Sequence, residues 1–67
     1  MKILLNNIEE TIEKEKLTIS ELLELKNFTF KMLVIKVNDK VIKKAQYPST
    51  PVMDGDHVIV IHLISGG

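Results

Sequence analysis

The sequence predicts an α+β fold with four to five strands and one helix, in the order ββαβ(β)β. Short apolar runs of strand length alternate with turn-forming pairs, Asn6-Asn7 and Asn38-Asp39 among them. One capped stretch between residues 17 and 28 has apolar residues at helical spacing. The chain has 67 residues, which is the length of a single domain.

The first two expected strands form a hairpin. Residues 2–6 are predicted as one strand, and residues 8–14 as a second strand whose glutamates lie on a solvated face. Asparagine tolerates positive φ better than most residues, so Asn6-Asn7 suits the tight turn between the two strands.

Residues 17–28 predict a helix of two to three turns. Thr18 followed by Glu21 forms a capping box ahead of the apolar run. One helical face is shared by four residues: Ile19, Leu22, Leu23 and Lys26. Asn27 suits the left-handed position that ends a helix, and Phe28 suits the hydrophobic contact that accompanies it.

The second half of the chain predicts the remaining strands. We expect strands at residues 32–38 and 41–43, joined by the turn Asn38-Asp39, and a last apolar strand over residues 57–64. Residues 47–51 are expected to be irregular, because each of their two prolines removes a backbone donor.

Strand parity predicts which side chains face the helix and which face away, because alternate residues of a strand point to opposite sides of the sheet. If Lys36 faces water, the core set is Ile3, Leu5, Leu33, Ile35, Val37, Val58 and Val60. The opposite face then carries Leu4, Val34, Ile59, Ile61 and Leu63, with Met32 as a further candidate. An exposed apolar patch of this kind usually marks an interaction surface, so we expect these residues to bind a partner. The alternatives are a parity slipped by one residue, or a last strand that is buried on both faces.

The composition excludes several classes of protein. Nine lysines balance nine acids and there is no arginine. The chain therefore lacks the excess of positive charge that is typical of proteins that bind nucleic acid or membranes. The absence of cysteine excludes disulfides, zinc–thiolate sites and a cysteine nucleophile. No apolar run approaches a membrane span, and the N-terminal residues turn polar too early for a signal peptide. We therefore expect a cytoplasmic protein.

The sequence finishes with Gly66-Gly67, directly after the last expected strand. Glycine has no Cβ and takes extended or bent conformations without steric cost. We expect a flexible tail, with Ser65 at its base, that threads a narrow channel of a partner enzyme and presents the Gly67 carboxylate for activation. The alternative is an ordinary frayed terminus.

No independent active site is predicted. His57 and His62 are five residues apart on a strand, so they point to opposite faces and cannot share a metal. Asp54-Gly55-Asp56 lacks the further ligands of a calcium site and is predicted to be a tight turn. Tyr47 is expected to be a packing aromatic. The serines stand in no motif with a base, so we expect no catalytic centre, no bound cofactor and no metal.

A series of short motifs follows in order along the chain: Met1-Lys2-Ile3, Asn6-Asn7, Leu17-Thr18, Glu21-Leu22-Leu23, Val37-Asn38-Asp39, Tyr47, Pro51, Asp54-Gly55-Asp56, Val58, Val60, His62 and Gly66-Gly67. In this combination the chain closely resembles the ThiS family, the ubiquitin-like sulfur carrier proteins of thiamine biosynthesis. The resemblance implies a β-grasp fold, with a mixed four- to five-stranded sheet packed on one helix. It also implies that residues 1–67 form one sulfur carrier domain with a flexible C-terminal tail.

The chain departs from the family pattern at several positions. Asn7, Asn27 and Ser65 stand where family members commonly carry glycine, and Lys43-Lys44 stands where they often read Pro-Arg. Asparagine is the next-best residue at positive φ, so the first two changes keep the backbone conformation. The lysines keep a positive charge but lose the bidentate fork of arginine.

The resemblance implies a function for the tail. A ThiF-type adenylyltransferase would use MgATP to activate the carboxylate of Gly67, with Gly66 keeping the tail slim. Sulfur from a persulfide donor would leave a thiocarboxylate on Gly67, and thiazole synthase would take that sulfur into the thiazole ring. The chain would then be a protein co-substrate of its partners and not an enzyme.

Three other functions fit the same sequence features. The small subunit of molybdopterin synthase also ends in Gly-Gly on a β-grasp domain, although such chains are typically longer. A modifier that is conjugated to proteins is a second possibility. A ubiquitin-like binding domain without C-terminal chemistry is the third.

Overall fold

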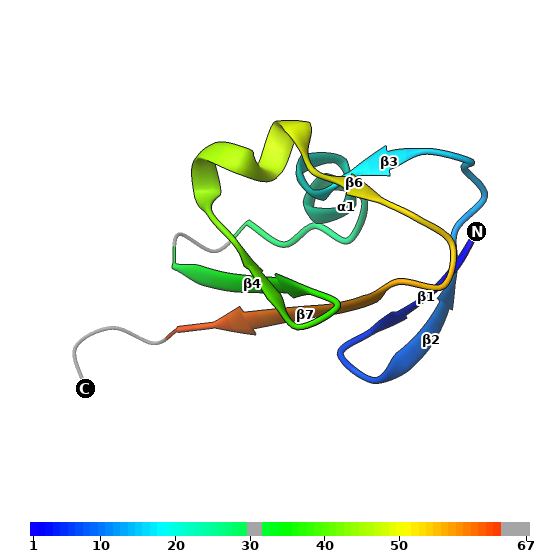
Figure 1. Ribbon diagram of the computed structural model, residues 1–67, viewed down its shortest axis with the longest axis horizontal. Helices are drawn as coiled ribbons and strands as arrows, with labels where there is room; N and C mark the ends of the chain where they lie inside the picture. The colour runs from blue at the N-terminus through cyan, green and yellow to red at the C-terminus, as the bar shows by residue number, and fades with distance from the viewer. Residues whose placement is uncertain (30–31, 64–67) are drawn as a thin grey trace.

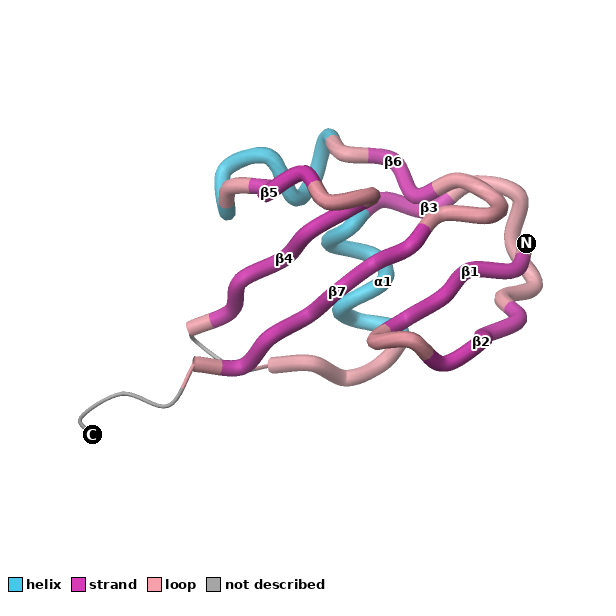
Figure 2. The backbone as a smooth tube through the Cα atoms, turned by 60° about the horizontal axis from the view of Figure 1, so that its bottom comes forward, coloured by secondary structure: helices cyan, strands magenta, loops and turns pink. Residues whose placement is uncertain are grey.

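The structure is a computed structural model, and it describes residues 1–29 and 32–63. Its main feature is a five-stranded sheet with the strand order β2-β1-β7-β4-β5 (Figures 1 and 2). The strands are β1 (Lys2–Leu5), β2 (Ile8–Thr11), β4 (Leu33–Val37), β5 (Lys40–Ile42) and β7 (His57–His62). The sheet is mixed, because β1 and β7 run parallel while the other neighbours are antiparallel.

One helix, α1 (Ile19–Leu25), crosses one face of this sheet (Figure 2). A two-stranded ribbon of β3 (Leu17–Thr18) and β6 (Pro51–Val52) leads into the helix, and a 3₁₀ helix, η1 (Lys44–Ser49), follows β5. This is the expected α+β, β-grasp arrangement, with five strands in the main sheet.

Both β-hairpins close through two-residue turns in the left-handed region. The φ angles are 52° and 66° at Asn6 and Asn7, and 49° and 69° at Asn38 and Asp39. Positive φ at both central residues defines the type I′ turn, whose twist matches that of the strands it joins. The asparagines therefore close both hairpins, as their positions in the sequence predict.

The helix has the predicted caps at both ends. Glu21 N–H donates to Thr18 Oγ1 at 3.2 Å, and Thr18 N–H donates to Glu21 Oε1 at 2.9 Å, which completes the capping box. At the other end Asn27 has φ 58°, and Phe28 N–H donates to Leu23 O at 2.8 Å. The hydrogen bond from Phe28 to Leu23 spans six residues, which is characteristic of a Schellman motif.

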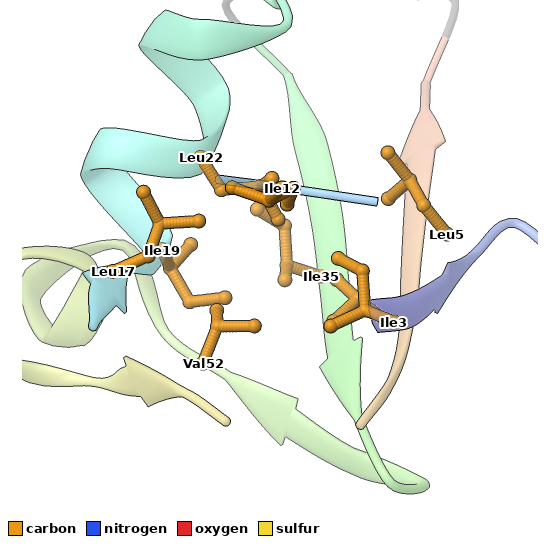
Figure 3. Packing of buried hydrophobic residues seen from close by; sticks show 9 residues of the cluster. Ile3, Leu5, Ile12, Leu17, Ile19, Leu22, Ile35 and Val52 are labelled. Atoms are coloured by element: carbon orange, nitrogen blue, oxygen red, sulfur yellow. The ribbon is translucent and has the colours of Figure 1, made fainter. Parts of the chain in front are cut away.

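The core lies between α1 and the sheet (Figure 3). Its buried members are Ile3, Leu5, Ile12, Leu17, Ile19, Leu22, Ile35, Val52 and Val58. Leu33, Val37 and Val60 pack against this core from the sheet. The strand parity expected from the sequence is therefore confirmed, and the slipped alternative is wrong.

Two predicted elements differ from the structure. The second strand ends at Thr11 and not at residue 14, because Thr11 lies opposite Lys2, the first residue of its partner strand β1. Residues 47–51 are not irregular, since they contribute to η1 and β6. Pro48 is compatible with η1 because the φ angle that proline imposes lies within the 3₁₀ range.

Among the described residues, the helices are too short to span a membrane.

Candidate functional site: the open sheet face and the end of the last strand

The end of β7 sets where the predicted tail begins. Leu63 N–H donates to Met32 O at 2.9 Å, so the pairing with β4 continues one residue beyond the strand. The predicted tail residues Ser65, Gly66 and Gly67 lie outside the described residues. The structure does describe the strand that precedes them in the sequence and the surface of the sheet around it.

That surface is the sheet face opposite α1. The antiparallel register places Val34 beside Ile61, and Lys36 beside Ile59 and Val41. Leu4 of β1 lies beside His57 at the start of β7. Paired residues point to the same side of a sheet, so these side chains share one face. The described chain places no helix over this face (Figure 2).

Apolar side chains gather on this face and form what we call the open-face patch: Leu4, Met32, Val34, Val41, Ile59, Ile61 and Leu63. Leu4, Ile61 and Leu63 are 42%, 43% and 42% exposed. Val34 and Ile59 are half-buried. In the neighbouring positions on the helix side, Ile35 and Val58 are fully buried. The last strand is therefore not buried on both faces, and all five residues predicted from parity lie together.

The sequence reasoning missed Val41, which is 58% exposed and extends the patch to the edge of the sheet. The signal was present in the sequence. A two-residue turn at Asn38-Asp39 fixes the register of its hairpin, so Val41 must lie opposite Lys36 and share its face.

The residues around Asp54-Gly55-Asp56 form a hydrogen-bonded turn at the start of β7. Lys2 N–H donates to Asp54 Oδ1 at 2.6 Å, and Met53 N–H donates to Asp56 Oδ2 at 2.8 Å. The other oxygen of Asp56 accepts from Asn38 Nδ2 at 3.0 Å. The two carboxylates therefore fasten this turn to β1 and to the β4–β5 hairpin.

The two histidines lie on opposite sides of the sheet, as expected. His57 pairs with Leu4 on the open face, whereas His62 pairs with Leu33 on the helix side. His57 Nε2 is buried and has no hydrogen-bond partner within the described ranges. In the part of the chain that the structure describes, no three histidine, aspartate or glutamate side chains come together as metal ligands.

Tyr47 packs against the core from η1, as the sequence predicts. Burial raises the pKa of its phenol above the ordinary value, because desolvation disfavours the phenolate. The side chain is therefore neutral at physiological pH and acts as a packing group in this fold.

Comparisons with known proteins agree with this geometry. The model of the ThiS family matches residues 3–67. A crystal structure of a thiamine biosynthesis protein (ThiS) from Geobacter metallireducens is 29% identical, with a TM-score of 0.87 and 100% of both chains covered. An NMR solution structure of a thiamine biosynthesis protein from the same organism is 29% identical, with a TM-score of 0.79, and covers 100% of this chain and 88% of the other. No curated protein matches the chain.

Proposed function

Since the chain belongs to the ThiS family of sulfur carriers, we propose that the carboxylate of Gly67 carries sulfur for thiazole formation in thiamine biosynthesis. The observation that supports this most directly is the extent of the family match, which includes Gly66-Gly67. The domain supplies no catalytic group of its own in this proposal. It supplies a carboxylate and a surface that presents it.

The proposed chemistry has two stages. A carboxylate is a poor electrophile, so a ThiF-type adenylyltransferase first uses MgATP to convert it into an acyl-adenylate with a good leaving group. The terminal sulfur of a persulfide donor then attacks the acyl-adenylate and displaces AMP, which joins the carrier to the donor as an acyl disulfide. A thiol reductant attacks the donor sulfur of this S–S bond, so that a disulfide forms on the donor and the thiocarboxylate of Gly67 is released. Thiazole synthase takes the sulfur from this group, and we place these steps in the cytoplasm.

The open-face patch is the proposed docking surface for these partners. It combines neighbouring apolar side chains, with Lys36 between Ile59 and Val41, with a position beside the end of β7, the strand that precedes the tail in the sequence. Apolar side chains on an uncovered sheet face favour association, because contact with a partner removes them from water. Docking of the patch would hold the tail close to the catalytic centre of the partner.

Intact-mass spectrometry tests the proposal. The purified chain is incubated with a ThiF-type adenylyltransferase, MgATP, a persulfide donor and a thiol reductant, and we expect a mass increase equal to the difference between sulfur and oxygen. An unchanged mass with an adenylyltransferase that is active on another carrier would favour the binding domain without C-terminal chemistry.

A substitution in the tail tests the channel. We expect Gly66→Val to abolish adenylation and to leave the thermal unfolding temperature unchanged, because the tail follows the last strand and a branched side chain blocks a narrow channel. Ser65→Gly is the matched control, since family members commonly carry glycine there, and it should be adenylated as wild type is. Full adenylation of Gly66→Val would contradict the channel.

A further inference from the structure

A second apolar surface lies around the edge of the sheet from the open-face patch. It is a groove of about 580 Å³ between the C-terminal end of α1, the β4–β5 hairpin and η1. Its apolar lining is Leu23, Phe28, Leu33, Ile42 and Tyr47. The volume falls within the range of about 300–1,000 Å³ that is usual for binding pockets.

The groove also has a positively charged border. Lys43 and Lys44 line it, and both side chains are exposed. Within the described residues neither lysine forms an ion pair. Asp39 is the sole acid between Lys36 and Ser49, a stretch that contains four lysines. The local charge is therefore positive and uncompensated beside an apolar lining.

The groove and the open-face patch are continuous. Val34 and Val41 belong to the patch and also line the groove. The groove and the patch meet at β5, which is one of the two edge strands of the sheet (Figure 2). A protein that covers the patch up to Val41 therefore reaches the groove without a second binding event.

We propose that the groove binds a segment of the partner protein in which a carboxylate side chain adjoins an apolar side chain. The apolar side chain occupies the lining beside Leu33 and Ile42, and the carboxylate lies beside Lys43 and Lys44. This inference rests on the proposed function in one respect, since it identifies the partner as the adenylyltransferase that docks on the patch. Charge complementarity of this kind mainly accelerates association and fixes orientation, and salt weakens it.

The test measures both binding and adenylation with the intact carrier and the ThiF-type adenylyltransferase. We expect the double variant Lys43→Gln and Lys44→Gln to bind roughly five-fold or more weakly at low salt, with the difference shrinking as salt rises. The apparent KM should rise and kcat should stay unchanged. The matched control is Lys14→Gln with Lys16→Gln, which removes the same charge from the β2–β3 connection and should bind as wild type does.

A second variant tests the apolar part of the groove. Thr29 is exposed and lines the groove, so Thr29→Trp should fill it without disturbing the core and should weaken binding at every salt concentration. Thermal unfolding at the wild-type temperature shows that the variants are folded.

The outcomes separate the two proposals. Wild-type binding by both groove variants overturns the groove inference and leaves the sulfur carrier proposal standing. Lysine-dependent binding without adenylation supports the groove and counts against the carrier chemistry. Tighter binding or faster adenylation of the lysine variant overturns the inference, because it would mean that the groove holds the carrier's own C-terminal carboxylate. Absence of wild-type binding to the adenylyltransferase also overturns it.

Discussion

Asn6 combines a backbone function with a side-chain function. With a φ angle of 52°, Asn6 is one of the two central residues of the first turn, and its N–H donates to Val58 O at 2.9 Å. Its Oδ1 accepts the N–H of Val60 at 2.8 Å. A single residue therefore closes the β1–β2 hairpin and continues the contact of β1 with β7 beyond the end of the strand.

A pair of glycine substitutions separates these two functions. Asn7 has φ 66° and family members commonly carry glycine there, so Asn7→Gly should change the free energy of unfolding by no more than about 0.5 kcal/mol. Asn6→Gly keeps the turn but removes the acceptor for Val60 N–H, and should cost about 1 kcal/mol more. Urea unfolding of the two variants measures the difference. Equal losses would show that the Asn6 side chain contributes nothing to stability.

Among the elements, α1 depends on a charged cap. The backbone N–H of Thr18 donates to the Glu21 carboxylate and, with the Thr18 side chain, holds the pKa of Glu21 below its ordinary value; Lys14 also lowers this pKa. Because the pKa of Glu21 is lower in the folded state than in the unfolded state, its ionised carboxylate stabilises the fold fully at pH values above the unfolded-state pKa. This contribution disappears as the pH falls through the lowered folded-state value.

The substitution Glu21→Gln tests the contribution of the Glu21 charge to stability. Glutamine at this position can still accept from Thr18, but it has no charge and does not titrate. We expect wild type to be more stable than Glu21→Gln at neutral pH, and the gap in free energy of unfolding to close in the acid range below the ordinary glutamate pKa of about 4.3. Glu24→Gln removes the same charge from α1 without touching the cap. The prediction is wrong if the gap for Glu21→Gln is independent of pH.

The alternation of β7 divides its side chains between two environments, and glutamate substitutions can test the division. Val60→Glu places a charge at a partly buried position against the core and should lower the unfolding temperature markedly, because it is costly to remove an unpaired charge from water. Ile61→Glu, one residue further, lies on the open face and should leave the unfolding temperature nearly unchanged while weakening adenylyltransferase binding. Thermal unfolding and a binding titration measure the two effects. An unfolded Ile61→Glu variant would place this residue in the core.

At the scale of the whole molecule, the sheet order places the open-face patch beside the end of β7, the strand that precedes the proposed tail in the sequence. β7 lies in the centre of the sheet, between β1 and β4, so its open face is flanked by Leu4 on one side and Val34 on the other. Leu63, the last described residue, directly follows this strand. Under the proposed function, a partner bound to the patch would restrict where the Gly67 carboxylate can lie, and this would raise its effective concentration at the catalytic centre.

This arrangement predicts that the tail alone is a poor substrate. The hexapeptide of residues 62–67 carries the same carboxylate as the intact chain but lacks the patch. We expect its kcat/KM for adenylation to be lower by roughly 100-fold or more, mostly through KM, because association is no longer aided by docking. Steady-state kinetics of the peptide and the intact chain measure this. Equal values would show that the partner does not recognise the sheet face.

The sequence by itself determined the features that depend on near neighbours in the chain. Thr18 and Glu21 cap the helix, Asn27 ends it, and the pairs Asn6-Asn7 and Asn38-Asp39 close the hairpins. These outcomes follow from local φ preferences and from hydrogen bonds that span a few residues. Strand parity has the same local origin, so the faces of Leu4, Val34, Ile59 and Ile61 were predictable before the sheet was known.

Tertiary structure decided the features that need distant segments to meet. Leu17 pairs with Val52 across the chain, η1 replaces an expected irregular segment, and Val41 joins the patch from an edge strand. The groove beside Lys43 and Lys44 exists only where α1, β5 and η1 converge. Such contacts depend on long-range pairing and on burial that no local pattern encodes, because the same short segments are compatible with several sheets.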